Sequence, residues 1–234
     1  MSSYLQRLLP SLFSYSRSDS FVNRLRARRS SVLKDCLDQL ASTSRPARIL
    51  DIGGTHTFWK MLGLADPDRF HITLLNLEKE ALPPGIRGFE SVGGTALKLD
   101  YQPGDFDFVF SNSVIEHMGS REGQVLMAQE VRRISARYLI QTPAFWFPLE
   151  PHSHLPGFQF LPHAVRAILI RHFRINYFPA GRTYMECLRV SHSTLMLTAG
   201  RFHRLFPGSR LHKERLFGLV KSYTVIGGFD DRAG

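Results

Sequence analysis

Cysteine and long apolar runs are both scarce in this chain of 234 residues. The two cysteines, Cys36 and Cys187, are too few for a disulfide framework, and they indicate a reducing compartment. No stretch approaches the roughly 20 consecutive apolar residues that a membrane-spanning helix needs. Internal repeats and low-complexity tracts are missing as well. We therefore expect a cytoplasmic globular protein, either soluble or peripheral to a membrane.

Acidic residues are also few, with 20 Asp and Glu against 30 Lys and Arg, which gives a formal net charge of +10. A hydrophobic share of 43% still supports a packed core and excludes wholesale disorder. A positive excess of this size fits a nucleic acid, an anionic membrane surface or an acidic substrate. The length suits one α/β domain with additions, which we place at residues 45–234.

The first 44 residues are predicted to form a basic helical segment. Its arginines stand at positions 7, 17, 24, 26, 28 and 29, and Asp19 is the one acidic residue among positions 1–31. This composition is typical of a surface helix, of a helix lying on an anionic bilayer, or of a targeting peptide. A surface helix would bury an apolar stripe of five residues, Leu25, Val32, Leu33, Leu37 and Leu40.

Short apolar segments alternate with helical patterns along the rest of the chain. Strands are predicted at 47–52, 71–77, 88–92, 106–111 and 138–142, and a closing hairpin at 209–215 and 218–226. Helical spacing between 127 and 134 separates two of the strands, a helix is expected at 195–206, and residues 157–193 are predicted to be a helical insertion over the site. This alternation predicts a doubly wound, mostly parallel sheet.

Polar residues cluster where the predicted strands end. Asp51 with Gly53 and Gly54 closes the first strand, Glu78 closes the second, and Asn112 closes the fourth. Ligands of such sheets bind at the carboxyl ends of the strands, and a carboxylate there can hold a ribose diol. The glycine turn lacks the spaced glycines of the dinucleotide fingerprint, and Asp51 would repel a pyrophosphate. The pattern favours another nucleoside-containing cofactor.

Two motifs resemble those of the class I S-adenosylmethionine-dependent methyltransferases, particularly the type-11 group. They are Ile49-Leu-Asp-Ile-Gly-Gly54 and, more specifically, Phe106-Asp-Phe-Val-Phe-Ser-Asn-Ser-Val-Ile-Glu-His117. The resemblance implies S-adenosylmethionine as the cofactor and a Rossmann-like seven-stranded sheet with an antiparallel C-terminal strand. It also implies a cofactor-binding set of nine residues: Asp51, Gly53, Gly54, Thr55, Glu78, Thr95, Ala96, Asn112 and Ser113. Thr55 stands where the family often has glycine, and Thr95 where it often has aspartate.

The segment after the fifth predicted strand, Thr142-Pro-Ala-Phe-Trp-Phe-Pro-Leu-Glu-Pro-His-Ser-His154, is aromatic and stiffened by proline. Its aromatic side chains could form an apolar wall for the acceptor. His152 is the first candidate for a general base, followed by His154, His117 and Glu150. The spacing of Glu150, His152 and His154 does not match a zinc pattern, and no metal site is predicted.

These features predict methyl transfer to a small molecule, most plausibly to an oxygen of a sugar, lipid-linked or secondary-metabolite acceptor. Two alternatives stay open: an RNA-modifying methyltransferase, and a non-catalytic interaction protein that keeps the fold. Positive charge concentrates in the N-terminal segment, at 166–189 and at 201–221. This favours an anionic acceptor, or a membrane surface contacted through the N-terminal segment. Nucleic acid is the less favoured partner because no RNA-binding module is recognisable.

Overall fold

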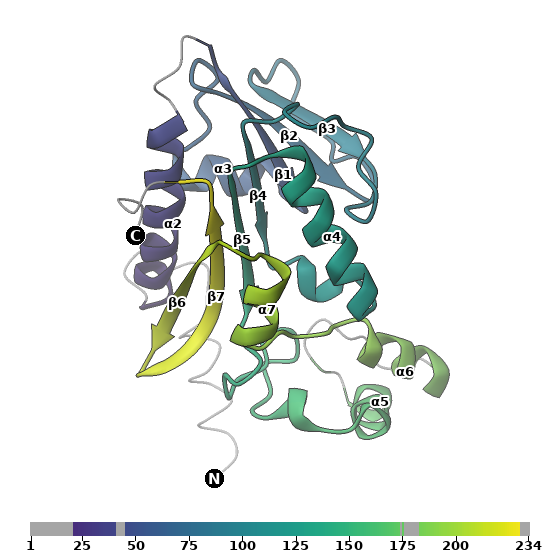
Figure 1. Ribbon diagram of the computed structural model, residues 1–234. Helices are drawn as coiled ribbons and strands as arrows, with labels where there is room; N and C mark the ends of the chain where they lie inside the picture. Colours follow the sequence, from purple (N-terminus) through teal and green to yellow (C-terminus); the bar gives the residue numbers. More distant parts are fainter. Residues whose placement is uncertain (1–20, 41–44, 174, 176–182, 230–234) are drawn as a thin grey trace. The chain divides into compact units, whose positions relative to one another are not determined.

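The computed structural model of the protein describes residues 21–40, 45–173, 175 and 183–229 (Figure 1). The chain divides into two compact units, one of residues 1–42 with 229–234 and the other of residues 43–228. The first unit contains helix α2, Phe21–Leu40. Four side chains of the predicted stripe are buried there: Val32, Leu33, Leu37 and Leu40. The arginines at positions 7 and 17 lie outside the described residues, as does the side chain of Leu25.

One seven-stranded sheet organises the second unit. Its strands are β1 (Ala47–Ile52), β2 (Phe70–Asn76), β3 (Phe89–Gly93), β4 (Phe108–Asn112), β5 (Tyr138–Pro143), β6 (Arg210–Leu216) and β7 (Leu219–Gly227). The strand order is β3-β2-β1-β4-β5-β7-β6. Strands β1 to β5 pair in parallel, while β7 runs antiparallel to both β5 and β6. The prediction of a doubly wound, mostly parallel sheet with an antiparallel C-terminal strand is confirmed.

Helices cover both faces of this sheet. Successive residues of a strand point to opposite faces, and the central strands have buried side chains on both. On one face, α4 (Arg121–Ile134) and α7 (Ala199–Leu205) share a core with the strands, in which Val109 and Val131 are fully buried. On the other face, α3 (His56–Leu62) places Trp59 edge-on against Phe110. Both layers leave the carboxyl ends of β1, β2, β4 and β5 at one edge, where parallel sheets bind ligands.

A helical insertion follows β5, as predicted. It contains the short turn η2 (Phe158–Phe160) and the helices α5 (His163–His172) and α6 (Tyr184–His192). These elements have a small hydrophobic core of their own, formed by Phe158, Ala167, Ile170, Ile175 and Cys187. The insertion therefore carries packing that is separate from the core beneath α4 and α7.

The predicted start of the helix at 195 is wrong. Leu197 forms an isolated parallel bridge with Ala144, and α7 begins only at Ala199. The Thr198 side chain accepts from Arg201 N and fixes this start as an N-cap. Pairing with the extended segment after β5 therefore outweighs the helical spacing of the apolar residues.

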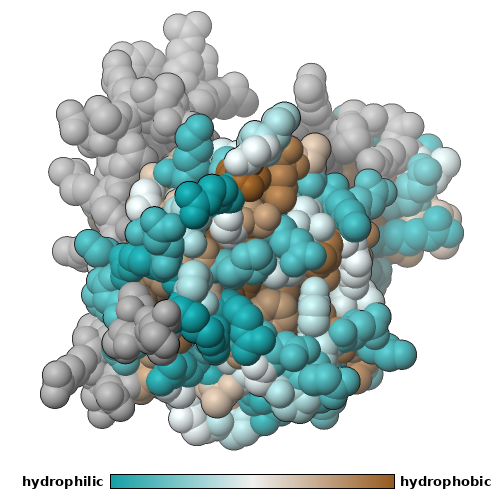
Figure 2. All heavy atoms as spheres, turned by 90° about the horizontal axis from the view of Figure 1, so that it is seen from above, coloured by the Kyte–Doolittle hydropathy of each residue, from teal (hydrophilic) through white to brown (hydrophobic). Residues whose placement is uncertain are grey.

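Among the helices of the described residues, none has the length and apolar character needed to cross a membrane. On the face seen from above in Figure 2, hydrophilic and hydrophobic side chains are interspersed.

Candidate functional site

The turn between β1 and α3 brings backbone close to two side chains, which explains its paired glycines. Gly53 has a φ of +75°, and a Cβ there would lie 2.4 Å from Val114 Cγ2. A Cβ on Gly54 would lie 1.7 Å from Asp51 Oδ2. Larger residues would therefore displace either the loop after β4 or the Asp51 carboxylate.

Asp51 is a buried carboxylate whose hydrogen bonding is only half satisfied. Trp59 Nε1 donates to its Oδ2 at 2.7 Å, whereas Oδ1 has no partner among the described residues. Burial raises the pKa of Asp51 to about 7; the bond from Trp59 opposes this shift and repulsion from Glu80 adds to it. A buried acceptor without a donor is costly, and a cationic ligand group would relieve that cost.

A cavity of about 410 Å³ opens at the carboxyl ends of β1, β2 and β4. Gly53, Thr95 and Ala96 line it, together with Asn76, the last residue of β2. Asn76 Nδ2 donates to Gly54 O at 2.9 Å, so its side chain bridges the ends of two neighbouring strands. Glu78 lies two residues beyond the strand, is exposed, and is not among the residues that line the cavity.

Three other predicted cofactor residues stand at the ends of elements beside this cavity. Thr55 is the N-cap of α3 and accepts from Phe58 N. Asn112 ends β4, and its Oδ1 is buried without a partner among the described residues. Ser113 has a left-handed φ of 59° and donates from Oγ to Gln141 Oε1 at 2.9 Å. None of these three lines the cavity itself.

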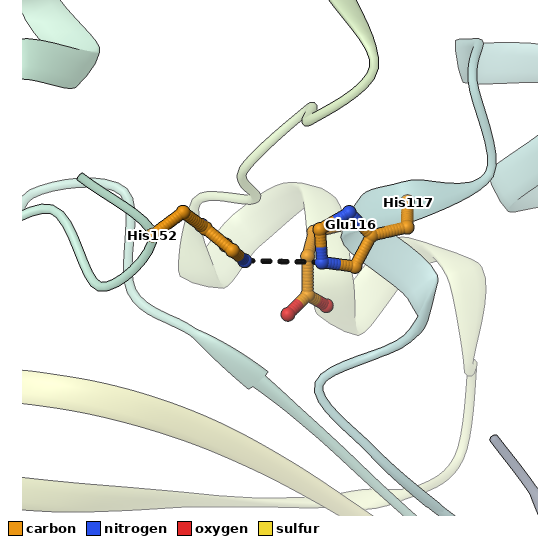
Figure 3. A group of neighbouring side chains, drawn as sticks. All are labelled: Glu116, His117 and His152. Carbon is orange, nitrogen blue, oxygen red and sulfur yellow. Dashed lines mark hydrogen bonds between the residues drawn. The ribbon is translucent and has the colours of Figure 1, made fainter. Parts of the chain in front are cut away.

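A chain of hydrogen bonds joins Glu150, His152 and His117. His152 Nδ1 lies 2.6 Å from Glu150 Oε1. His152 Nε2 lies 3.0 Å from His117 Nε2, and Figure 3 marks this second bond by a dashed line. Glu150 also accepts from the backbone of His152 and of Ser153, at 3.1 and 2.5 Å. These bonds fix the orientation of the His152 ring and leave its Nε2 directed at His117.

The two histidines have opposite pKa shifts. Desolvation, followed by the charge of His152, lowers the pKa of His117 to about 4. Burial also disfavours the charged form of His152, but the hydrogen bond to Glu150 and the charges of Glu150 and Glu116 together outweigh burial and raise the pKa of His152. The pKa of Glu150 is lowered despite its burial, because His152 and Ser153 donate to it. A proton taken up by the pair is therefore held on His152.

Glu116 lies beside this pair, with its side chain in Figure 3 extending below the two rings. It is fully buried, its Oε2 accepts from Thr142 Oγ1 at 2.9 Å, and its Oε1 has no partner among the described residues. Burial raises the pKa of this carboxyl to about 7. Ligand atoms of Glu116, His117 and His152 lie within 4.8 Å of one another, so these three residues could hold a divalent ion such as Zn²⁺.

His154 is not part of this cluster. It is exposed, has a left-handed φ of 57°, and donates from its backbone to Glu150 O at 2.8 Å. The sequence predicts no metal site at Glu150, His152 and His154, and the possible metal ligands among the described residues are instead Glu116, His117 and His152.

A second cavity, of about 200 Å³, lies beneath the helical insertion. His152 and Glu150 line it, as do Phe145 of the segment after β5 and three arginines, Arg121, Arg166 and Arg201. His117 lines the first cavity and is hydrogen-bonded to His152 of the second. The histidine pair therefore stands at the junction of the two cavities.

Sequence reasoning assigned no role to Asn76, Glu116, Arg121 or Arg201. Asn76 could have been found from its place at the end of an apolar strand. Glu116 is adjacent to His117 in the recognised motif, but nothing local shows that its carboxylate is buried. Arg121 and Arg201 stand 80 positions apart on α4 and α7, and the sequence carries no signal that they line one cavity.

No protein-family model matches the chain. A 53-residue match, 40% identical, links it to two uncharacterized proteins of Mycobacterium tuberculosis, MT1557 (strain CDC 1551) and Rv1509 (strain H37Rv). The match covers 23% of this chain and 18% of each relative, so it spans less than a fifth of the length of these curated relatives.

Three solved structures illustrate the structural similarity. A SAM-dependent methyltransferase from Aquifex aeolicus is 12% identical, with 85% of this chain and 87% of that chain covered and a TM-score of 0.43. The structure of SAM-dependent methyltransferases from Methanosarcina mazei is 18% identical, with 79% of this chain and 92% of that chain covered and a TM-score of 0.45. A structure from Rhodobacter sphaeroides, described as that of proposed zinc-dependent alcohol dehydrogenases, is 11% identical. It covers 81% of this chain and 87% of its own chain, with a TM-score of 0.51.

The second unit has the class I S-adenosylmethionine-dependent methyltransferase fold. The order β3-β2-β1-β4-β5-β7-β6 with a reversed β7 defines it. At these low identities the likeness concerns the fold alone. The chemistry has to be argued from the side chains at the two cavities.

Proposed function

We propose that this protein is a methyltransferase that uses S-adenosylmethionine to methylate an oxygen of a small-molecule acceptor. The bond between His117 and His152 carries the proposal, because it places a proton-accepting pair where the 410 and 200 Å³ cavities meet. The larger cavity would take the cofactor and the smaller one the acceptor. Methyl transfer would then occur beside the histidines.

The residues around the larger cavity fit the chemistry of this cofactor. The orphan Oδ1 of Asp51 lies beside the glycine turn and offers negative charge to the ammonium of the methionine moiety. Asn76 lines the cavity at the end of β2 and has an amide oxygen that could accept from ribose hydroxyls. Thr95 and Ala96 form the wall expected near the adenine.

When bound, S-adenosylmethionine supplies an electrophilic methyl group on a cationic sulfur. Transfer of this methyl group to the acceptor oxygen would form an O–C bond in place of the C–S bond and would release S-adenosylhomocysteine. The proton of the acceptor hydroxyl goes to the imidazole pair, and Glu150 holds it on His152. The walls of the two cavities would align the acceptor oxygen with the methyl group. Alignment of this kind supplies the larger part of the rate enhancement in such reactions.

Two measurements test the proposal. Calorimetry should give saturable, one-to-one binding of S-adenosylmethionine, and no binding at millimolar concentration would overturn the enzyme proposal in favour of a non-catalytic protein. Transfer of labelled methyl groups should then be screened over hydroxylated small molecules. Steep, salt-dependent affinity for RNA with labelling of RNA alone would instead favour the RNA-modifying alternative.

A further inference from the structure

The second cavity is strongly cationic for its size. Arg121 at the start of α4, Arg166 of α5 and Arg201 of α7 all line it, and Glu150 is the one carboxylate among the described residues of its wall. Glu150 already accepts from the ring of His152 and from two backbone N–H groups. Three arginines from three separate helices thus line one cavity, and the described residues of its wall include no second carboxylate.

Arg121 and Arg201 have no ion-pair partner in the part of the chain that the structure describes. Burial lowers the pKa of Arg201, and repulsion by Arg121 and Arg204 lowers it further. Glu122 attracts both Arg121 and Arg201 at longer range without forming a salt bridge. Unpaired like charges that face one cavity are unfavourable until an anion neutralises them.

Arg166 is held in place by backbone carbonyls. Its Nε donates to Leu161 O and its Nη2 to Gln159 O, each at 2.8 Å. Burial lowers the pKa of this guanidinium, and attraction to Glu150 partly compensates. The charge of Arg166 is therefore fixed in position before any ligand arrives, and a ligand that uses it loses less side-chain entropy.

The rest of the cavity wall includes apolar side chains and one glutamine, Gln159. Phe145, Phe158 and Ile170 supply the apolar part. Gln159 uses its Nε2 on Phe145 O and Phe147 O, whereas its buried Oε1 has no partner among the described residues. An orphan acceptor of this kind fits a ligand hydroxyl or N–H group.

We infer that the acceptor is a compact, apolar molecule bearing an acidic group, a carboxylate, sulfate or phosphate, that binds Arg121 and Arg201. Its apolar body packs on Phe145 and Phe158, and its hydroxyl faces His152. This inference rests on the proposed function for the identity of the cavity as the acceptor site. It adds the chemical class of the substrate, because the arginines would select acceptors that carry an acidic group.

The test compares two fluorescent ligands with the same aromatic body, 6-hydroxy-2-naphthoate and 2-naphthol, which differ in one carboxylate. Their affinities are measured by calorimetry on the full-length protein and on the double variant Arg121→Gln, Arg201→Gln. Arg171→Gln is the matched control, because Arg171 is an exposed arginine of α5 that does not line the cavity. Circular dichroism and the melting temperature of each variant verify folding.

The naphthoate should bind the unmodified protein at least tenfold more tightly than naphthol, a preference of about 1.4 kcal/mol. The double variant should lose this preference and the control should keep it. A naphthoate affinity no higher than that of naphthol, including undetectable binding of both, overturns the inference, as does an equal loss in Arg171→Gln. S-adenosylmethionine binding is measured separately, so its absence would remove the proposed function while leaving the result for the cationic cavity readable.

Discussion

The Nε2 atoms of His117 and His152 lie 3.0 Å apart, and each histidine lines a different cavity. The bond connects η1 (Ile115–His117), which follows β4, to the loop after β5. A single shared proton therefore links the site proposed for the cofactor to the site proposed for the acceptor. The predictions on proton transfer below depend on this pair.

His152→Ala should slow methyl transfer without weakening the cofactor complex. Loss of a positioned base typically costs about 100-fold or more in rate. Calorimetry should give an unchanged dissociation constant for S-adenosylmethionine, while labelled-methyl transfer measures the rate. His172→Ala is the control, since His172 is exposed at the end of α5 and outside both cavities. Unchanged turnover in His152→Ala would remove His152 from the mechanism.

The rate of transfer should rise with pH through the pKa of His152. That pKa is raised by Glu150 above the ordinary value of 6.5, and the ring accepts a proton only after it has lost its own. His117, Glu150 and Glu116 are the neighbouring titratable groups. Glu150→Gln removes the charge that raises this pKa, so it should move the rising limb to lower pH. A rate that falls as the pH rises would contradict this assignment.

Asp51→Asn should stabilise the free protein at alkaline pH and abolish tight cofactor binding. The pKa of Asp51 is raised by burial to about 7, so its contribution to stability is complete below its unfolded value near 4 and is lost as the pH rises through 7. Urea titration should show little change at pH 4 and a gain of about 4 kcal/mol at pH 8. Asp100→Asn, at an exposed carboxylate, should show neither effect.

Asn76→Ala should weaken S-adenosylmethionine binding by about tenfold, the scale of one lost hydrogen bond in a partly buried site. Glu78→Ala separates the two candidates for the ribose contact, because Asn76 lines the cavity and Glu78 does not. We expect the larger loss in Asn76→Ala. A larger loss in Glu78→Ala would return the ribose contact to the carboxylate.

Removal of metal should leave methyl transfer unchanged. The Nε2 atoms through which His117 and His152 could bind an ion already form one hydrogen bond with each other, in which one nitrogen donates and the other accepts. Excess Zn²⁺ should inhibit by occupying Glu116, His117 and His152, and Glu116→Gln should reduce that inhibition. Activity that EDTA abolishes and Zn²⁺ restores would assign the three residues to a metal centre.

The sheet could be predicted from the sequence because its signals are local. Residues 47–52 form a short apolar run before a glycine turn, and β1 has these same bounds. Helix α7 shows where local signals fail, since Leu197 pairs with the distant Ala144. At the site, the glycine turn with Asp51 could be found from one segment. The His117–His152 contact spans 35 positions, and only the packing of two loops produces it.

The hydrophobic core within the insertion has an evolutionary consequence. Phe158, Ala167, Ile170 and Cys187 pack with one another, apart from the side chains that hold α4 and α7 on the sheet. Arg166 projects from this separately packed unit into the cationic cavity. If the proposed function holds, substitutions on α5 and α6 would change which acceptor binds without disturbing the packing around the proposed cofactor site. Natural selection could then alter the specificity for the acceptor independently of the binding of the cofactor.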